Sequence, residues 1–192
     1  MEEYKIAQPI GYYFEVIPSK LIDLILEEID KINQDDLIDA SVGGIKSSEI
    51  ILPKIRNSKV HWWYDTHWVT SLISHYFNKI NRDFWEYDLT YLDGIQVTTY
   101  FENDHYTWHC DYGVEQDSNQ TRKISMSLLV SDSDDYEGGD LEFIDYHGNK
   151  VSAPREKGTM IFFDSRIPHR VTPVTKGKRV SLVAWMFGPK LK

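Results

Sequence analysis

The stretch GIQVTTYF, residues 94–101, marks a change in the pattern of the sequence. From here onward, apolar and polar residues alternate in short runs, as expected for half-buried strands. Turn-forming segments such as DYEGGD and VTKGKR separate the runs. The predicted strands are 94–101, 106–111, 123–130, 140–144, 150–153, 159–163, 170–174 and 179–187. About eight short strands at this spacing predict an antiparallel sandwich or jelly-roll barrel.

Before residue 88 the apolar residues recur at helical spacing. One helix is expected from Ser19 and a second over about 65–82, whereas 34–60 reads as irregular because it carries Gly, Pro, Ser and Asn. Residues 9–17 read as a short strand. We therefore predict a mainly β fold with flanking α-helices, a double-stranded β-helix (jelly-roll, cupin-like) barrel buttressed by N-terminal helices. We expect one domain over 1–192, with helical support in 1–87 and the jelly-roll core in 88–189.

Composition excludes several classes of protein. The chain has 192 residues, which suits one domain, and a formal charge of −9, which argues against nucleic acid as a partner. Its single cysteine, Cys110, rules out an intrachain disulfide and a cysteine-based zinc site, and fits a reducing cytoplasm. We expect no signal peptide and no membrane span. The oligomeric state stays open.

The tripeptide HCD, residues 109–111, is the first sign of chemistry. Side chains alternate across a strand, so His109 and Asp111 point to one side and are able to share a metal ion. Alone, this pattern is common. With His169, which follows Pro168 in a later segment, it gives two histidines and one carboxylate, the facial triad of non-haem Fe(II) oxygenases. Zinc accepts the same ligands, so the triad leaves the metal undecided.

Arg179 helps to distinguish between these kinds of metal site. It opens a segment in which Arg179, Ser181, Val183 and Trp185 share one face, while the opposite face is apolar. A strand covered on both sides would bury this arginine, and a buried guanidinium needs an anionic partner. A guanidinium beside a hydroxyl suits bidentate capture of a carboxylate. A solvated surface arginine is the alternative.

The segments YFENDHYTWHCD (100–111), SDSDDYEGGDLEF (131–143) and IPHRVTPVTKGKR (167–179) together resemble the prolyl 4-hydroxylase-like group of Fe(II)/2-oxoglutarate dioxygenases, in particular its bacterial and phage hydroxylases of the PKHD type. The resemblance covers about residues 88–187, and more loosely the segment IRNSKVHWW (55–63) and the helix after it. It implies the cytoplasm of a bacterium, or of a phage-infected host, as the location. It implies Fe(II), 2-oxoglutarate and O2, with ascorbate as a further candidate, and oxidative decarboxylation of 2-oxoglutarate to succinate and CO2.

The resemblance also implies roles for individual residues. His109, Asp111 and His169 resemble the iron ligands. Arg179, assisted by Ser181, resembles the residue that pairs with the C5 carboxylate of 2-oxoglutarate, and Tyr100 the tyrosine that hydrogen-bonds it. For the substrate pocket the candidates are Tyr106, Trp185 and Arg122. Trp62, Trp63, Trp68 and Trp85 are expected in the core, with Trp63 and Tyr64 as candidates for the barrel mouth.

The expected reaction is hydroxylation of an unactivated C–H bond. Asp111 favours hydroxylation, because related halogenases leave the carboxylate position open for halide. A prolyl residue in a peptide or protein is the first choice of substrate, and a free amino acid or other small metabolite the second. Alternatives from other classes are a zinc-dependent hydrolase and a non-catalytic jelly-roll binding module. The polar segment 112–121 is either a lid over the substrate or a surface loop.

Overall fold

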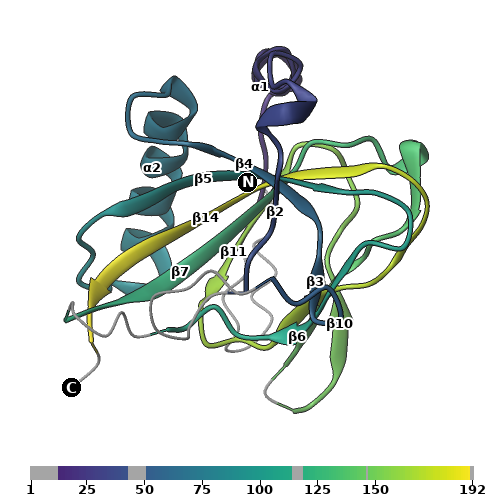
Figure 1. Ribbon diagram of the computed structural model, residues 1–192. Coiled ribbons are helices and arrows are strands. Elements are labelled where there is room, and N and C mark those ends of the chain that lie inside the picture. The colour runs from purple at the N-terminus through teal and green to yellow at the C-terminus, as the bar shows by residue number, and fades with distance from the viewer. Residues whose placement is uncertain (1–12, 43–50, 114–118, 146, 191–192) are drawn as a thin grey trace.

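The alternating segments form the strands of two facing antiparallel sheets (Figure 1). The computed structural model describes residues 13–42, 51–113, 119–145 and 147–190. The larger sheet has the strand order β1 (Tyr13–Val16), β11 (Thr159–Asp164), β7 (Gln120–Leu129), β14 (Arg179–Pro189), β5 (Leu92–Tyr100), β4 (Lys59–Trp63) and β2 (Ile38–Asp39). The smaller sheet has the order β10 (Lys150–Ser152), β9 (Leu141–Ile144), β12 (His169–Val171), β6 (His105–His109) and β3 (Arg56–Asn57).

A third pairing joins two short strands, β8 (Tyr136–Gly138) and β13 (Val174–Gly177). The helices are α1 (Ser19–Ile29) and α2 (Trp68–Ile80), and α2 continues into a π-helical turn at Asn81–Trp85. Short 3-10 turns lie at Gln34–Asp36 and Ser133–Asp135. Within the described residues, no helix is long and apolar enough to cross a membrane.

The two faces of the larger sheet pack against different parts of the molecule, one against the helices and the other against the smaller sheet. One face carries Val180, Leu182 and Ala184 of β14 and packs in one apolar cluster with helix residues such as Ile73 and Phe77. The opposite face contributes Ile161 and Phe163 of β11 to a second cluster, shared with Phe143 of the smaller sheet. Because side chains alternate along each strand, the same strands build the core under the helices and the space between the sheets.

This arrangement confirms the predicted fold, mainly β with helices packed on one face of a double-stranded β-helix. Strand β1 confirms the predicted strand over 13–16, whereas residues 9–12 of that prediction lie outside the described residues. The predicted strand 170–174 is divided between β12 and β13, with Pro173 at the division, where proline has no N–H to donate to a ladder.

The prediction that 34–60 is irregular was wrong in part. Strand β4 pairs with β5 in the larger sheet, β2 pairs with β4, and β3 pairs with β6 in the smaller sheet. Two of these strands have only two residues each, too few to show a period of two. The segment before residue 88 therefore supplies strands to both sheets as well as helices.

Candidate metal centre

Strands β6 and β12 bring the two predicted histidines together. In their antiparallel pairing His109 lies directly opposite His169, and the two ring centroids are 4.1 Å apart. Asp111 follows two residues after His109, beyond the end of β6. Its Oδ1 lies 3.6 Å from Nε2 of His109 and its Oδ2 lies 3.4 Å from Nε2 of His169. One ligand atom from each residue thus falls within 4.8 Å of the others, close enough to share one metal ion.

The other nitrogen of each imidazole is already engaged. Nδ1 of His109 lies 2.8 Å from the carbonyl oxygen of Thr107, and Nδ1 of His169 lies 2.9 Å from that of Ile167. A carbonyl only accepts, so Nδ1 carries the proton in both rings and Nε2 keeps a free lone pair. Backbone contacts of this kind fix the tautomer and orientation of metal-binding histidines. The donor set therefore fits a divalent metal.

Burial sets the protonation states of these groups. It lowers the pKa of His169 to about 4, so this imidazole is neutral near pH 7. Burial acts in the opposite direction on Asp111, but the neighbouring His169 and His109 outweigh it and hold the pKa of this carboxyl well below its usual range. At neutral pH the cluster therefore offers the neutral imidazole of His169 and the carboxylate of Asp111, protonation states that metal binding requires.

A cavity of about 120 Å³ opens beside the three ligands, between the sheets. Every other residue predicted for the site lines it: Arg179, Tyr100, Ser181, Tyr106, Trp185 and Arg122. The ring of Tyr106 stacks on His109 with centroids 3.5 Å apart, and the guanidinium of Arg122 lies 4.0 Å above the ring of Trp185. The segments that carry these residues are far apart in sequence but meet in one cavity.

Among the residues that line the cavity, Arg179 is unusual because it is a buried cation without an ion-pair partner in the described part of the chain. Only 3% of it is exposed, yet no carboxylate among the described residues forms an ion pair with it. Its Nη1 donates to Oγ of Ser181 at 2.9 Å, and its Nε has no hydrogen-bond partner. Burying a cation with an unsatisfied N–H is costly. A carboxylate entering the cavity would relieve that cost.

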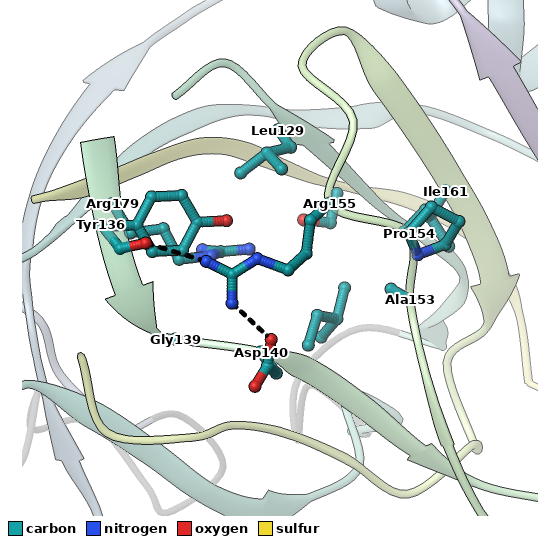
Figure 2. Close-up of a pocket in the computed structure, with 11 residues that line it drawn as sticks. Leu129, Tyr136, Gly139, Asp140, Ala153, Pro154, Arg155, Ile161 and Arg179 are labelled. Atoms are coloured by element: carbon teal, nitrogen blue, oxygen red, sulfur yellow. Dashed lines mark hydrogen bonds and ion pairs between the residues drawn. The ribbon is translucent and has the colours of Figure 1, made fainter. Parts of the chain in front are cut away.

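Figure 2 shows a small pocket that Arg179 lines together with Tyr136, Gly139 and Arg155. Nη1 of Arg155 bonds Oδ1 of Asp140 at 2.7 Å, and its Nη2 bonds the carbonyl oxygen of Tyr136 at 3.0 Å. Gly139 has φ +63°, and a Cβ there would lie 3.0 Å from Cδ of Arg179. Arg179 therefore lines both the cavity beside the metal ligands and this small pocket, whose volume is about 10 Å³.

Sequence reasoning missed several residues of this wall. Gln96 lies on the cavity face of β5, and the alternation that placed Tyr100 there also predicts it, since both have even numbers in one strand. The assignment of the tryptophans was partly wrong. Trp62 lines the cavity, whereas Trp63 is buried in the core beneath the helices.

Arg56, from the loosely matched IRNSKVHWW segment, also lines the cavity. Half of the suggested lid at 112–121, residues 114–118, lies outside the described residues.

Comparison with known proteins gives two kinds of match. Residues 95–187, just under half of the chain, match the family model of the 2OG-Fe(II) oxygenase superfamily. A PKHD-type hydroxylase of Saccharophagus degradans is 41% identical over 63 residues, which are 33% of this chain and 27% of that protein. The chain spans less than half the length of the curated relatives that it matches.

Solved structures share the fold over nearly the whole chain. A prolyl-4-hydroxylase of Pseudomonas putida has a TM-score of 0.73 at 17% identity, covering 95% of both chains. A prolyl hydroxylase from Trichoplax adhaerens, in complex with a peptide fragment of the hypoxia inducible factor oxygen degradation domain, has a TM-score of 0.74 at 19% identity. That match covers 92% of this chain and 83% of the other.

Proposed function

We propose that this chain hydroxylates an unactivated C–H bond, most suitably in a prolyl residue of a peptide or protein. Its residues 95–187 match the family model of the 2OG-Fe(II) oxygenase superfamily, and part of the chain is similar to PKHD-type hydroxylases. The family implies Fe(II), 2-oxoglutarate and O2 as cofactor and co-substrates. Ascorbate is a further candidate for keeping the iron reduced. The observation that carries the proposal is the buried, unpaired Arg179 in the same cavity as the His-Asp-His cluster.

Each group in the cavity then has a task. His109, Asp111 and His169 hold the metal, and Arg179 with Ser181 binds the C5 carboxylate of 2-oxoglutarate. When bound, iron and 2-oxoglutarate supply the oxidising chemistry, with succinate and CO2 as products. The aromatic walls formed by Tyr100, Tyr106 and Trp185 exclude water from it. A zinc hydrolase and a silent binding module both leave Arg179 without a role.

The walls near the cavity support a peptide substrate. A second cavity of about 210 Å³ lies beside the first and shares the lining residues Ser41, Trp62 and Gln96 with it. Along it the rings of Trp62 and Tyr64 stack with centroids 6.3 Å apart, and Tyr64 is 61% exposed. Aromatic-lined grooves are typical binding sites for extended proline-containing segments. The structural neighbours named as prolyl hydroxylases point the same way.

A free amino acid is the second candidate, and one residue favours it. Arg56 is only 8% exposed, and the hydrogen bonds it donates go to neutral acceptors: Oγ of Ser58, the carbonyl of Ser41 and Oε1 of Gln96. A small substrate could offer it a carboxylate. The cytoplasm is the proposed location, in keeping with the free thiol of Cys110.

Anaerobic reconstitution tests the proposal. Fe(II) added with 2-oxoglutarate should give the weak visible charge-transfer band of an iron-bound 2-oxo acid, and air should then produce succinate. Matched panels of proline-containing peptides and free amino acids, analysed by mass spectrometry for a gain of one oxygen, separate the two substrate classes. If no charge-transfer band appears and no succinate forms, the oxygenase assignment is contradicted.

A further inference from the structure

Two buried serines stand behind Asp111. Ser125 lies on β7, and Ser165 follows the last residue of β11; neither side chain is exposed. Oγ of Ser125 lies 2.8 Å from Oδ2 of Asp111 and 2.9 Å from Oγ of Ser165. Both serines are outside the set of residues that line the cavity. Their hydroxyl groups therefore reach the site through Asp111.

The direction of these hydrogen bonds follows from counting protons. A hydroxyl has one proton to donate, and an ionised carboxylate has none. Ser125 must therefore donate to Asp111, and Ser165 must donate to Ser125. Successive bonds of this kind polarise and strengthen one another in a buried setting. The two hydrogen bonds therefore run in one direction, from Ser165 to Ser125 and from Ser125 to Oδ2 of Asp111.

The backbone at Ser165 ties the same segments together. Its N–H donates to the carbonyl of Lys123 in β7 at 3.1 Å, and its carbonyl accepts from the N–H of Tyr112 at 2.8 Å. Tyr112 is the neighbour of Asp111, which lies past the end of β6 and so outside the strand ladder. These bonds fix the peptide next to Asp111, and the serine chain fixes its side chain.

We propose that Ser125, supported by Ser165, is a positioning residue for the metal centre. It fixes the rotation of the Asp111 carboxylate so that the carboxylate faces Nε2 of both histidines, and the affinity for the metal depends on its hydroxyl. This inference rests on the metal-binding part of the proposed function. Partners of metal ligands in general contribute roughly 10–100-fold to metal affinity or activity.

An isosteric pair of variants tests the hydroxyl alone. Ser125→Thr keeps it and Ser125→Val replaces it with a methyl group, so both add the same bulk. The probe is Co(II), titrated by calorimetry into the full chain without 2-oxoglutarate or substrate. We expect Ser125→Val to bind Co(II) about 10–100-fold more weakly than Ser125→Thr. Ser165→Ala should weaken binding by a smaller factor, because it removes only the supporting bond.

Thr159→Val is the matched control. Thr159 is 2% exposed on β11, and its hydroxyl has no hydrogen-bond partner, so removing it should leave Co(II) affinity unchanged. If the added bulk prevents folding of both Ser125 variants, Ser165→Ala against Thr159→Val carries the comparison. Equal Co(II) affinities within each pair would overturn the inference while leaving the metal site intact. Absence of Co(II) binding in the wild-type chain would overturn the proposed metal site, and the inference with it.

Discussion

At the scale of single residues, one buried arginine distinguishes this site from a generic metal cluster. Arg179 is held in the wall by its own strand and by a single bond to Ser181, and it lies over the ring of Tyr100 with 5.6 Å between guanidinium carbon and ring centroid. Such a side chain costs stability when no anion is present. A protein retains a costly group of this kind where binding requires it.

Replacing Arg179 with Met should separate the contribution of the arginine to 2-oxoglutarate binding from its cost to stability. Affinity for 2-oxoglutarate should fall by roughly 3–5 kcal/mol, the usual cost of removing one side of a buried charge pair. Affinity for Co(II) should be unchanged, and the ligand-free chain should be no less stable than the wild type. Calorimetry for each ligand and a urea titration provide the measurements. A matching loss of Co(II) affinity would show that the arginine instead shapes the metal centre.

At the scale of elements, the strands of the larger sheet connect the site to the helical layer. β14 presents Val180, Leu182 and Ala184 to the core under the helices and Arg179 and Ser181 to the cavity. Helix α2 covers the core face, where Phe77 meets Phe162 of β11 edge to face at 5.1 Å. The helices therefore contribute to the site indirectly, by holding the sheet that carries it.

Truncation of Phe77 to Ala should lower the free energy of unfolding by roughly 3–5 kcal/mol, because the ring is fully buried and leaves a cavity. Urea denaturation measures it. Ser71→Ala, an exposed position on the same helix, serves as the control and should change stability by less than about 0.5 kcal/mol. Equal effects of the two substitutions would mean that the helix is not packed on the sheet as described.

At the scale of the whole molecule, one polar cluster links distant segments near the metal centre. Arg166 bonds Oδ1 of Asp164 at 2.8 Å through Nε, and the hydroxyl of Tyr87 donates to Oδ2 at 2.5 Å. Burial would raise the pKa of Asp164, but the bonds from Arg166 and Tyr87 outweigh it and lower that pKa. Burial and the bond to Asp164 raise the pKa of Tyr87 to about 12.

This cluster predicts a dependence of stability on pH. A carboxyl with a lowered pKa in the folded state stabilises the protein above its unfolded pKa of ~3.9, and this contribution is lost as the pH falls further. Asp164→Asn should therefore reduce the melting temperature at pH 7 and make its decline below about pH 4 shallower. Calorimetry from about pH 3 to about pH 7 measures the melting temperature at neutral pH and its decline at low pH. The exposed Asp23→Asn should leave the curve unchanged; a parallel shift in both variants would contradict the assignment to Asp164.

The sequence by itself determined which side chains share a face. Alternation along 179–187 placed Arg179, Ser181 and Trp185 together, and the structure has them lining one cavity. The prediction that His109 and Asp111 share a strand was wrong, because β6 ends at His109, although both residues line that cavity. Helical periodicity likewise located α1 and α2. These inferences succeed because the period of a helix or strand is a local property of the chain.

Only the tertiary structure decided which strands meet. The register that sets His169 against His109 joins segments sixty residues apart, and nothing local to either specifies it. The same holds for the serine pair behind Asp111, and for Trp62 rather than Trp63 in the cavity wall. A one-residue difference moves a side chain to the opposite face of a sheet, and which face is the core depends on what packs against it.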